Sequence, residues 1–369
     1  MDNPLNNAII YRKVELLPDY EDPNHGDLEV QMIFLKNDYS MGAAPKVLEK
    51  LVETNMELTD GYGMDEYCKA AADTIRKMID CQDADVHFLV GGTQTNQTSL
   101  SAFLMRPHYS VISADTGHIC VHETGAIEAT GHKINHVATS DGKLRPADIE
   151  SVMELHEDEH WVKPKAIYIS NSTETGLIYS KQELLDLRTT CDKYGLIMYL
   201  DGARMAMSLT CEESDLTFAD YPKIVDAFYI GGTKCGAMFG EALVIVNEEL
   251  KADFRHIIKR HGGMLAKGRL LGVQFSALME DGYYLELGEH ANRMAKLLAE
   301  GIKEKGYEFA IPPQTNLLFP YFPEELIEKL KGEVKFEPYH LKKDGLKTIR
   351  LVTSWATSED EVNNFLDLI

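Results

Sequence analysis

Short apolar runs recur along the first two thirds of the chain, and each ends in small or polar residues. Amphipathic segments with helical spacing separate these runs, for example Thr95–Met105 and Lys181–Tyr194. Strands that alternate with helices predict a largely parallel sheet, and continuous apolar character predicts strands covered on both faces. The expected strands are VHFLV (86–90), SVISA (110–114), AIYIS (166–170), LIMYL (196–200) and AFYI (227–230).

The pattern changes after EALVIV (241–246). A long helical stretch, roughly 248–305, is rich in Ala, Leu, Glu and Lys, and shorter apolar runs follow at LLFPYF (317–322) and TIRLVT (348–353). A closing helix is expected to begin near Ser358, because acidic residues follow it as they do at many helix starts. This second region is therefore predicted to be a smaller α+β unit.

We expect a fold of the α/β class in three parts. Residues 31–250 form a large domain with a mostly parallel sheet covered by helices, and residues 251–369 form a small α+β domain. Residues 1–30 are polar and interrupted by prolines, so we expect an arm there and not a domain.

The net charge of the chain limits the classes of molecule that it is expected to bind. There are 37 Lys and Arg against 59 Asp and Glu, a net charge of −22, which disfavours nucleic acid and anionic membranes as partners. The six cysteines form no C-x-x-C motif, and the start of the sequence has no long apolar stretch typical of a signal peptide or anchor. We therefore expect reduced thiols, a cytoplasmic location and small-molecule partners.

Polar residues follow each expected strand directly. The carboxyl ends of parallel strands meet at one edge of a sheet, where ligands bind in α/β proteins. Charged and polar groups are therefore predicted to converge at this edge. The segments concerned are GGTQTN (91–96), DTGH (115–118), NSTETG (171–176), DGAR (201–204) and GGTK (231–234).

Three of these segments carry groups with a candidate chemistry. GGTQTN opens a helix, where backbone N–H groups suit a phosphate, although an ordinary glycine-rich turn has the same composition. Asp201 ends an apolar strand, so its carboxylate needs a partner there or caps a helix. Arg204 either pairs with Asp201 or presents its guanidinium to a substrate carboxylate.

Lys234 stands among Gly, Thr, Cys and Ala. A lone lysine after a strand is most often a surface residue, but these small neighbours leave room for a planar ligand beside it. Partial desolvation would lower the pKa of its amine and make it a nucleophile. One ligand accounts for the lysine, the carboxylate and the phosphate nest together, namely pyridoxal 5′-phosphate.

The sequence resembles the fold-type I pyridoxal-phosphate enzymes and, more narrowly, the threonine aldolase and β-eliminating lyase family. The resemblance begins with LDGAR (200–204) and GGTKCGA (231–237), which contain Asp201 and Lys234. Further segments that resemble the family follow in its order and together span about residues 31–360. They are LKNDYS (35–40), GYGMDEY (61–67), GGTQTNQ (91–97), GHICVHETGAIE (117–128) and IRLVTSW (349–355).

The resemblance implies a set of cofactor-binding residues. Lys234 would bind the cofactor aldehyde covalently, Asp201 would bond the pyridinium nitrogen, and His118 would stack on the ring. The remaining cofactor-binding residues would be Gly92, Thr93 and Gln94 at the phosphate, Thr233 beside the lysine, and Arg269 reaching the phosphate of a neighbouring subunit. The family also implies a homodimer or homotetramer with its active site at the dimer interface.

The resemblance also implies the substrate contacts. Arg204 and Arg350 would hold the substrate carboxylate, and Asn37 and Glu174 would lie at the substrate. Glu174 departs from the family pattern, because T-E-T-G stands here where its aldolases have T-H-N-G. Retro-aldol cleavage requires a group that takes the β-hydroxyl proton, and Glu174, His118 or a water are the alternatives.

We predict a pyridoxal-phosphate-dependent lyase that cleaves the Cα–Cβ bond of a β-hydroxy amino acid, turning threonine into glycine and acetaldehyde. A β-eliminating lyase or an aminotransferase-like enzyme acting on another small amino acid is the alternative. A relative that binds the cofactor without catalysis is a second class, which the combination of Lys, Asp and two Arg residues disfavours.

The segment HEDEH (156–160) matches the zinc-binding pattern H-E-x-x-H. It is strongly acidic and is expected at the amino edge of the sheet, away from the other candidate residues. A metal-dependent hydrolase is therefore disfavoured, and no metal is predicted. His122 and Glu123, beside His118, are expected to be structural.

Overall fold

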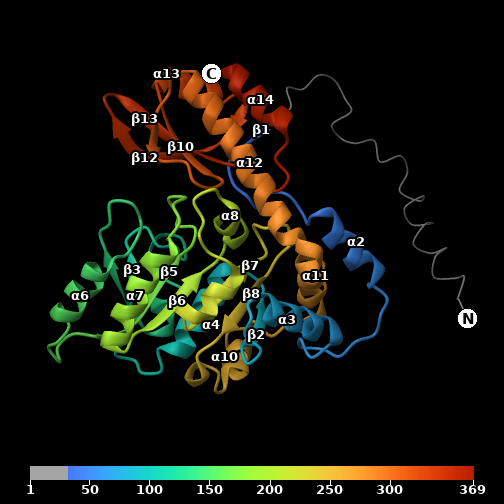
Figure 1. Ribbon diagram of the computed structural model, residues 1–369, viewed down its shortest axis with the longest axis vertical. Coiled ribbons are helices and arrows are strands. Elements are labelled where there is room, and N and C mark those ends of the chain that lie inside the picture. The colour runs from blue at the N-terminus through green and yellow to red at the C-terminus, as the bar shows by residue number, and fades with distance from the viewer. Residues whose placement is uncertain (1–31) are drawn as a thin grey trace, which may run out of the picture.

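A seven-stranded sheet forms the centre of the large domain in the computed structural model, which describes residues 32–369 (Figure 1). Its strand order is β2-β8-β7-β6-β5-β3-β4, and only β8 runs antiparallel to its neighbours. All five expected strands form, so the predicted fold class is confirmed. The bounds are β2 Asp85–Leu89, β3 Tyr109–Ala114, β4 Lys133–Val137, β5 Lys163–Ser170, β6 Ile197–Asp201, β7 Ala227–Gly231 and β8 Glu241–Ile245.

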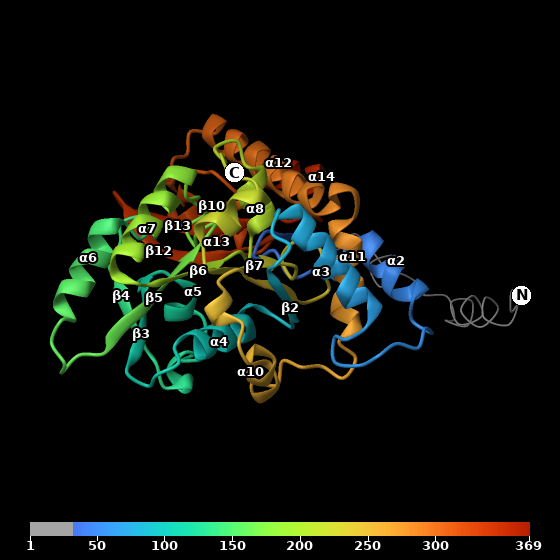
Figure 2. The same cartoon turned by 60° about the horizontal axis from the view of Figure 1, so that its bottom comes forward.

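Helices cover both faces of this sheet, which explains why its central strands are apolar throughout. Tyr168 of β5 packs in a core with residues of α4 and α10, whereas its neighbour Ile167 packs in the core that includes α7. Figure 2 shows α7 and α8 on one side of the sheet and α4 and α10 on the other. The bounds are α4 Gly92–Phe103, α6 Pro146–Leu155, α7 Lys181–Tyr194, α8 Met205–Thr210, α9 Tyr221–Ile224 and α10 Phe254–Arg260.

The helix α7 begins and ends at the residues that the sequence predicts. Ser180 caps it by accepting from the backbone of Glu183, whose side chain accepts in return from the backbone of Ser180. Gly195 ends it in the left-handed region at φ 62°, which favours glycine. By contrast, α4 begins three residues earlier than expected, so its first turn contains the glycine-rich segment.

The predicted long helix over 248–305 is divided into several helices. Gly262 and Gly282 adopt positive φ between α10, α11 and α12, and Asp281 does so too. The last and longest of these helices, α12 (Tyr283–Glu304), contacts α8 of the large domain and α14 of the small domain. Helices α2 (Pro45–Glu53), α3 (Glu66–Met78) and α11 (Arg269–Met279) lie together beside the sheet, as Figure 1 shows.

The small domain contains a four-stranded antiparallel sheet, mostly red in Figure 1. Its strand order is β12-β13-β10-β9, and α12 and α14 pack against it. The start of the described chain joins this domain, because β1 (Ile33–Phe34) pairs with β11 (Val334–Lys335). The remaining bounds are α5 His118–Val121, β9 Phe309–Ile311, β10 Leu317–Phe322, α13 Glu324–Leu330, β12 Glu337–Lys343, β13 Leu346–Val352 and α14 Glu359–Leu368.

The division into domains at 31–250 and 251–369 stays a prediction, since α10 and α11 pack on the large domain whereas β1 pairs within the small one. The predicted arm over residues 1–30 lies outside the described residues. Within residues 32–369, no helix combines the length and the apolar character needed to cross a membrane.

Candidate active site

The register of the sheet brings the polar strand ends together. Ser170 of β5 pairs with Asp201 of β6, and Gly231 of β7 pairs with Glu241 of β8. Leu89, at the end of β2, pairs with the same Glu241 from the other side. The segments that follow β2, β5, β6 and β7 therefore start at one edge of the sheet, as the strand pattern predicts.

The loop that carries Lys234 is built from small residues because other parts of the chain pack closely against its backbone. The backbone N–H groups of Gly232 and Thr233 both donate to the carbonyl of Gly240, each at 3.0 Å. A Cβ atom on Gly232 would lie 2.5 Å from that carbonyl, and one on Gly236 would lie 2.5 Å from Leu287. Burial, and then the charge of Arg204, lower the pKa of the Lys234 amine, which makes it a better nucleophile.

Glu241 holds this loop in place, and the sequence analysis did not identify it. Its Oε2 accepts from the backbone of Gly232 at 2.8 Å, and its Oε1 accepts from the hydroxyl of Thr233 at 2.7 Å. Burial raises the pKa of the Glu241 carboxyl to about 7. An acidic residue at the start of the apolar run EALVIV was the available signal, because a buried carboxylate requires partners.

Asp201 is buried at the end of β6, with three donors around its carboxylate. Tyr168 donates its hydroxyl to Oδ2 at 2.5 Å, Asn96 donates to the same oxygen at 3.2 Å, and the backbone of Ala203 donates to Oδ1 at 2.9 Å. Arg204 caps the start of α8 and is not a partner of Asp201. Asp201 is therefore held by neutral donors, two of which, Asn96 and Tyr168, the sequence analysis missed.

His118 is linked to the same network through Glu123. The His118 Nδ1 lies 2.8 Å from Glu123 Oε1, and Asn96 donates to that oxygen at 2.7 Å. Asn96 thus bridges the carboxylates of Glu123 and Asp201, and its own oxygen accepts from Tyr199 at 3.0 Å. Burial raises the pKa of the Glu123 carboxyl. This network fixes the orientation of the His118 ring, consistent with the structural role expected of Glu123.

Arg204 forms an ion pair with Asp38, a partner that the sequence did not indicate. Its Nε and Nη2 donate to the two carboxylate oxygens of Asp38, at 2.7 and 3.0 Å, and Asn316 donates to Asp38 at 2.9 Å. Burial would raise the pKa of Asp38, but the charges of Arg204 and Lys234 and these bonds outweigh it and lower the pKa.

Arg350, by contrast, forms no hydrogen bond or ion pair with another side chain among residues 32–369. It lies on β13 of the small domain, and its buried Nε has no hydrogen-bond partner among residues 32–369. Burial, and then the charge of Arg204, lower the pKa of Arg350. An unpaired buried guanidinium is costly, so this group is suited to an anionic ligand.

The glycine-rich segment forms the start of α4. No side chain caps this helix at Gly91, so the N–H groups of its first turn are available to an anion. Thr93 is exposed at this turn. The Gln94 side chain is already engaged, since it donates to the carbonyl of His261 and accepts from the backbone of Val90, both at 3.3 Å.

Two further predicted residues already have hydrogen-bond partners within the chain. The Asn37 side chain accepts from the backbone of Tyr39 at 3.0 Å and from the hydroxyl of Ser40 at 2.8 Å. Arg269 donates to the carbonyls of Glu57, at 2.7 Å, and of Thr54. Their predicted roles at the substrate and at a neighbouring subunit stay predictions.

The HEDEH segment begins where α6 ends. His156 is the C-terminal cap of α6, its Nδ1 lies 2.7 Å from the carbonyl of Val152, and its ring packs edge-on against Trp161. Among residues 32–369, no three His, Cys, Asp or Glu side chains gather as metal ligands do. The prediction that the protein uses no metal stays a prediction.

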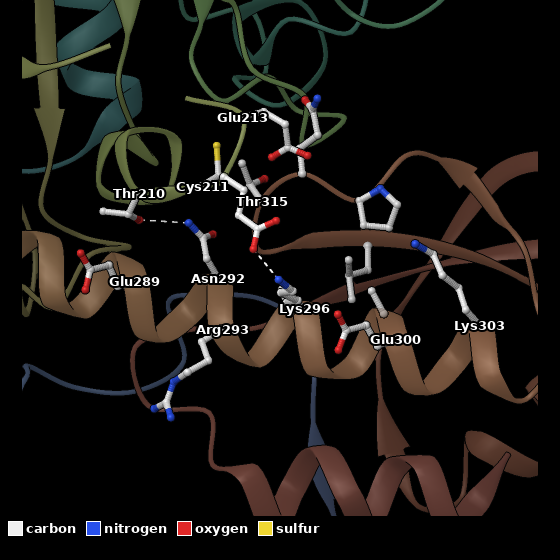
Figure 3. Close-up of a pocket in the computed structure, with 16 residues that line it drawn as sticks. Thr210, Cys211, Glu213, Glu289, Asn292, Arg293, Lys296, Glu300, Lys303 and Thr315 are labelled. Carbon is white, nitrogen blue, oxygen red and sulfur yellow. Dashed lines mark hydrogen bonds and ion pairs between the residues drawn. The ribbon is translucent and has the colours of Figure 1, made fainter. Parts of the chain in front are cut away.

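A groove of about 650 Å³ lies elsewhere, between α12 and the segment that follows α8 (Figure 3). Its walls carry charges of both signs, and Lys296 forms an ion pair with Glu212 across it. Asn292 of α12 donates to Thr210, at the end of α8, at 3.0 Å. It shares no lining residue with the site around Lys234.

Comparison with known proteins agrees with this geometry. A model of the beta-eliminating lyase family matches residues 35–325. The low specificity L-threonine aldolase of Pseudomonas sp. (strain NCIMB 10558) is 32% identical over 336 residues, covering 89% of this chain and 94% of that protein. The low specificity L-threonine aldolase of Saccharomyces cerevisiae is 25% identical over 350 residues, covering 89% of each.

Solved structures give the same result. The threonine aldolase of Leishmania major superposes with a TM-score of 0.89 at 47% identity, covering 91% of this chain and 98% of that one. An aspartate aminotransferase of Thermus thermophilus superposes with a TM-score of 0.70 at 15% identity, covering 100% and 96%, which shows a shared fold alone. The fold is that of the fold-type I pyridoxal-phosphate enzymes, and the chain belongs to the beta-eliminating lyase family.

Proposed function

We propose that this protein is a pyridoxal-phosphate-dependent threonine aldolase, which cleaves the Cα–Cβ bond of threonine to give glycine and acetaldehyde. The observation that carries the proposal is the partly buried amine of Lys234 at the same strand edge as the carboxylate of Asp201. The threonine aldolases of Pseudomonas and Leishmania major, which match nearly the whole chain, support the choice of reaction.

The residues at this edge fit pyridoxal phosphate. Lys234 offers an amine of lowered pKa for the aldehyde, the uncapped start of α4 offers N–H groups for the phosphate, and Asp201 offers a carboxylate for the ring nitrogen. We assign the ring face to His118, whose ring is held by Glu123. When bound, the cofactor supplies an electron sink for the pair left at Cα when a bond there breaks.

We assign the substrate carboxylate to Arg350, because its buried Nε has no hydrogen-bond partner among the described residues. Arg204 stays a second candidate, although two of its donors already bind Asp38. The substrate carboxylate would then be held from β13 of the small domain, while the substrate amine lies at the cofactor that Lys234 holds on the large domain.

We also propose that the protein is a homodimer or homotetramer whose interface includes the outer face of α2. Leu48 and Val52 on this helix are 47% and 50% exposed, and Met238, four residues after Lys234, is 46% exposed. These side chains line one groove of about 340 Å³. Because the groove adjoins the Lys234 loop, a second copy of the chain seated there would lie next to the active site.

The six cysteines are free thiols, which suits a reducing compartment, and we propose a cytoplasmic location.

The experiment that tests this function is product analysis. The protein loaded with pyridoxal phosphate is incubated with L-threonine, and the products are identified by NMR. Glycine and acetaldehyde in equal amounts support the aldolase, whereas 2-oxobutanoate and ammonia would favour the β-eliminating alternative. Lys234→Ala serves as the control, and its cleavage rate is expected to fall by at least about 100-fold, the lower end of what a positioned proton-transfer group contributes.

A further inference from the structure

Glu174 lies in the loop after β5, and only one of its two carboxylate oxygens is fixed by the protein. Its Oε1 accepts from the backbone N–H of His118 at 2.9 Å and from the hydroxyl of Ser170 at 2.8 Å. These donors come from the start of α5 and the end of β5, both at the edge of the sheet where Asp201 lies. The carboxyl is therefore oriented rigidly toward one side.

The second oxygen of Glu174 has no partner in the described part of the chain. Among residues 32–369, Oε2 has no hydrogen-bond partner, and it is not one of the fully buried atoms that lack a partner. Glu241 provides the contrast, because both of its oxygens accept bonds from the Lys234 loop. A carboxylate that only supports the fold would be expected to look like Glu241, whereas Glu174 presents an oxygen to the space at the strand edge.

The surroundings of Glu174 favour an exchangeable proton on it. Within the described residues it forms no ion pair with Lys, Arg or His, although the positive charge of Arg204 lies near it. Burial, and then the negative charge of Asp201, raise the pKa of the Glu174 carboxyl. Its protonated and ionised forms are thus closer in free energy than those of a solvated glutamate.

We propose that Glu174 is the catalytic residue that takes the proton from the β-hydroxyl group of the substrate, an inference that rests on the proposed aldolase function. The O–H bond breaks, the proton moves to Oε2, and the O–H electron pair forms the second C–O bond of the aldehyde. The Cα–Cβ bond breaks and leaves its electron pair at Cα. Cα then takes up one proton. The atoms and the charge of threonine are thus fully accounted for by glycine and acetaldehyde.

The test compares two reactions of the loaded enzyme. Glu174→Gln keeps the shape of the side chain and an oxygen for His118 and Ser170, but it cannot take a proton. Cleavage of L-threonine is expected to fall by about 10²- to 10⁴-fold, the contribution typical of a general base. Exchange of the glycine Cα proton with D₂O, which involves no hydroxyl, is expected to stay close to wild type.

A conservative variant and a binding measurement distinguish a role of Glu174 in proton transfer from a purely structural role. Glu174→Asp retains a carboxylate and is expected to recover part of the cleavage that Glu174→Gln loses. In short calorimetric titrations, Glu174→Ala is expected to lose the difference in affinity between L-serine and L-alanine, which differ by the β-hydroxyl alone. Ser170→Ala, which removes one donor to Oε1 and keeps the carboxyl, is the matched control and should retain most of that difference.

Three results would overturn the assignment. Near-normal threonine cleavage in Glu174→Gln would assign the proton to His118 or a water. An equal loss of glycine exchange and cleavage would make Glu174 a structural residue. An unchanged serine preference in Glu174→Ala would remove the hydroxyl contact, and because this is a binding measurement it remains decisive even if the wild-type protein cleaves no threonine.

Discussion

At the scale of single residues, the site depends on the partners of its buried charges. Asp201 is surrounded by neutral donors, so its negative charge is not cancelled by a nearby cation bonded to it. Arg204 would be the obvious partner from its place in DGAR, but Asp38 binds it instead. The carboxylate of Asp201 is thereby kept available for a positively charged group on a ligand.

Replacing Asp201 is expected to affect stability as well as catalysis. Asp201→Ala leaves the hydroxyl of Tyr168 without its acceptor and leaves the amide of Asn96 with Glu123 as its remaining carboxylate acceptor, so the free energy of unfolding should fall by about 1–3 kcal/mol. The variant should still bind pyridoxal phosphate through Lys234 and retain its visible absorbance, yet lose threonine cleavage. Urea titration and the absorbance spectrum check both parts, and normal turnover would remove the assigned role.

Tyr168→Phe is the matched control for that variant. It removes one donor to Asp201 and leaves the carboxylate in place. A smaller loss of both stability and activity than in Asp201→Ala is expected, because Asn96 and the backbone of Ala203 still hold Asp201.

At the scale of elements, the β7–β8 connection shows how one buried carboxylate organises a loop. Glu241 binds the backbone of Gly232 and the hydroxyl of Thr233, the two residues that precede Lys234. The position of the amine is therefore set from β8, the strand that runs antiparallel to its neighbours. A loop held only by its glycines would be free to move on the timescale of catalysis.

Glu241 is expected to make stability depend on pH. Its folded pKa, about 7, lies above its ordinary value of 4.5, so the stability it contributes is fully present below 4.5 and lost as the pH rises to about 7. Between pH 4.5 and pH 8, the unfolding free energy of the wild type should thus fall by about 3 kcal/mol relative to that of Glu241→Gln. Urea titrations at both pH values measure this shift, and a difference independent of pH would contradict it.

The elements of this fold could be predicted more completely than their contacts. A continuous apolar run is enough to identify a buried strand such as β6, and parallel strands imply that Asp201 and Lys234 share an edge. The partners of these residues depend on register and on distant segments. Asn96 meets Asp201 across 105 positions and Arg204 meets Asp38 across 166, and no local pattern indicates which of many polar residues will be chosen.

At the scale of the whole molecule, exposed apolar side chains are concentrated near the active site. Met56, just beyond α2, is 70% exposed, and Leu48, Val52 and Met238 form the groove beside the Lys234 loop. Patches of this kind on a protein surface generally mark an interface. A second copy of the chain is the occupant that would also explain why the patch adjoins the site.

Charging this surface is expected to dissociate the oligomer. Val52→Asp should shift the mass measured by light scattering toward that of one chain, 41.5 kDa, because a carboxylate is costly to bury in an apolar interface. Leu185→Asp is the matched control, since Leu185 is 38% exposed on α7, away from α2, and should leave the mass unchanged. An oligomer that persists in Val52→Asp would place the interface elsewhere.

The triad of Asp38, Arg204 and Asn316 has a consequence for the order in which the protein matures. Asp38 accepts both bonds from the Arg204 guanidinium, and Asn316, 278 positions after Asp38, donates to the same carboxylate. Contacts of such long sequence separation form late, after the chain has paid the entropy of closing the intervening loop. A nascent chain that ends before Asn316 would already contain the amine and the sheet, yet Asp38 would lack this partner. The complete Asp38 network thus forms only after the first strands of the small domain have been added to the central sheet.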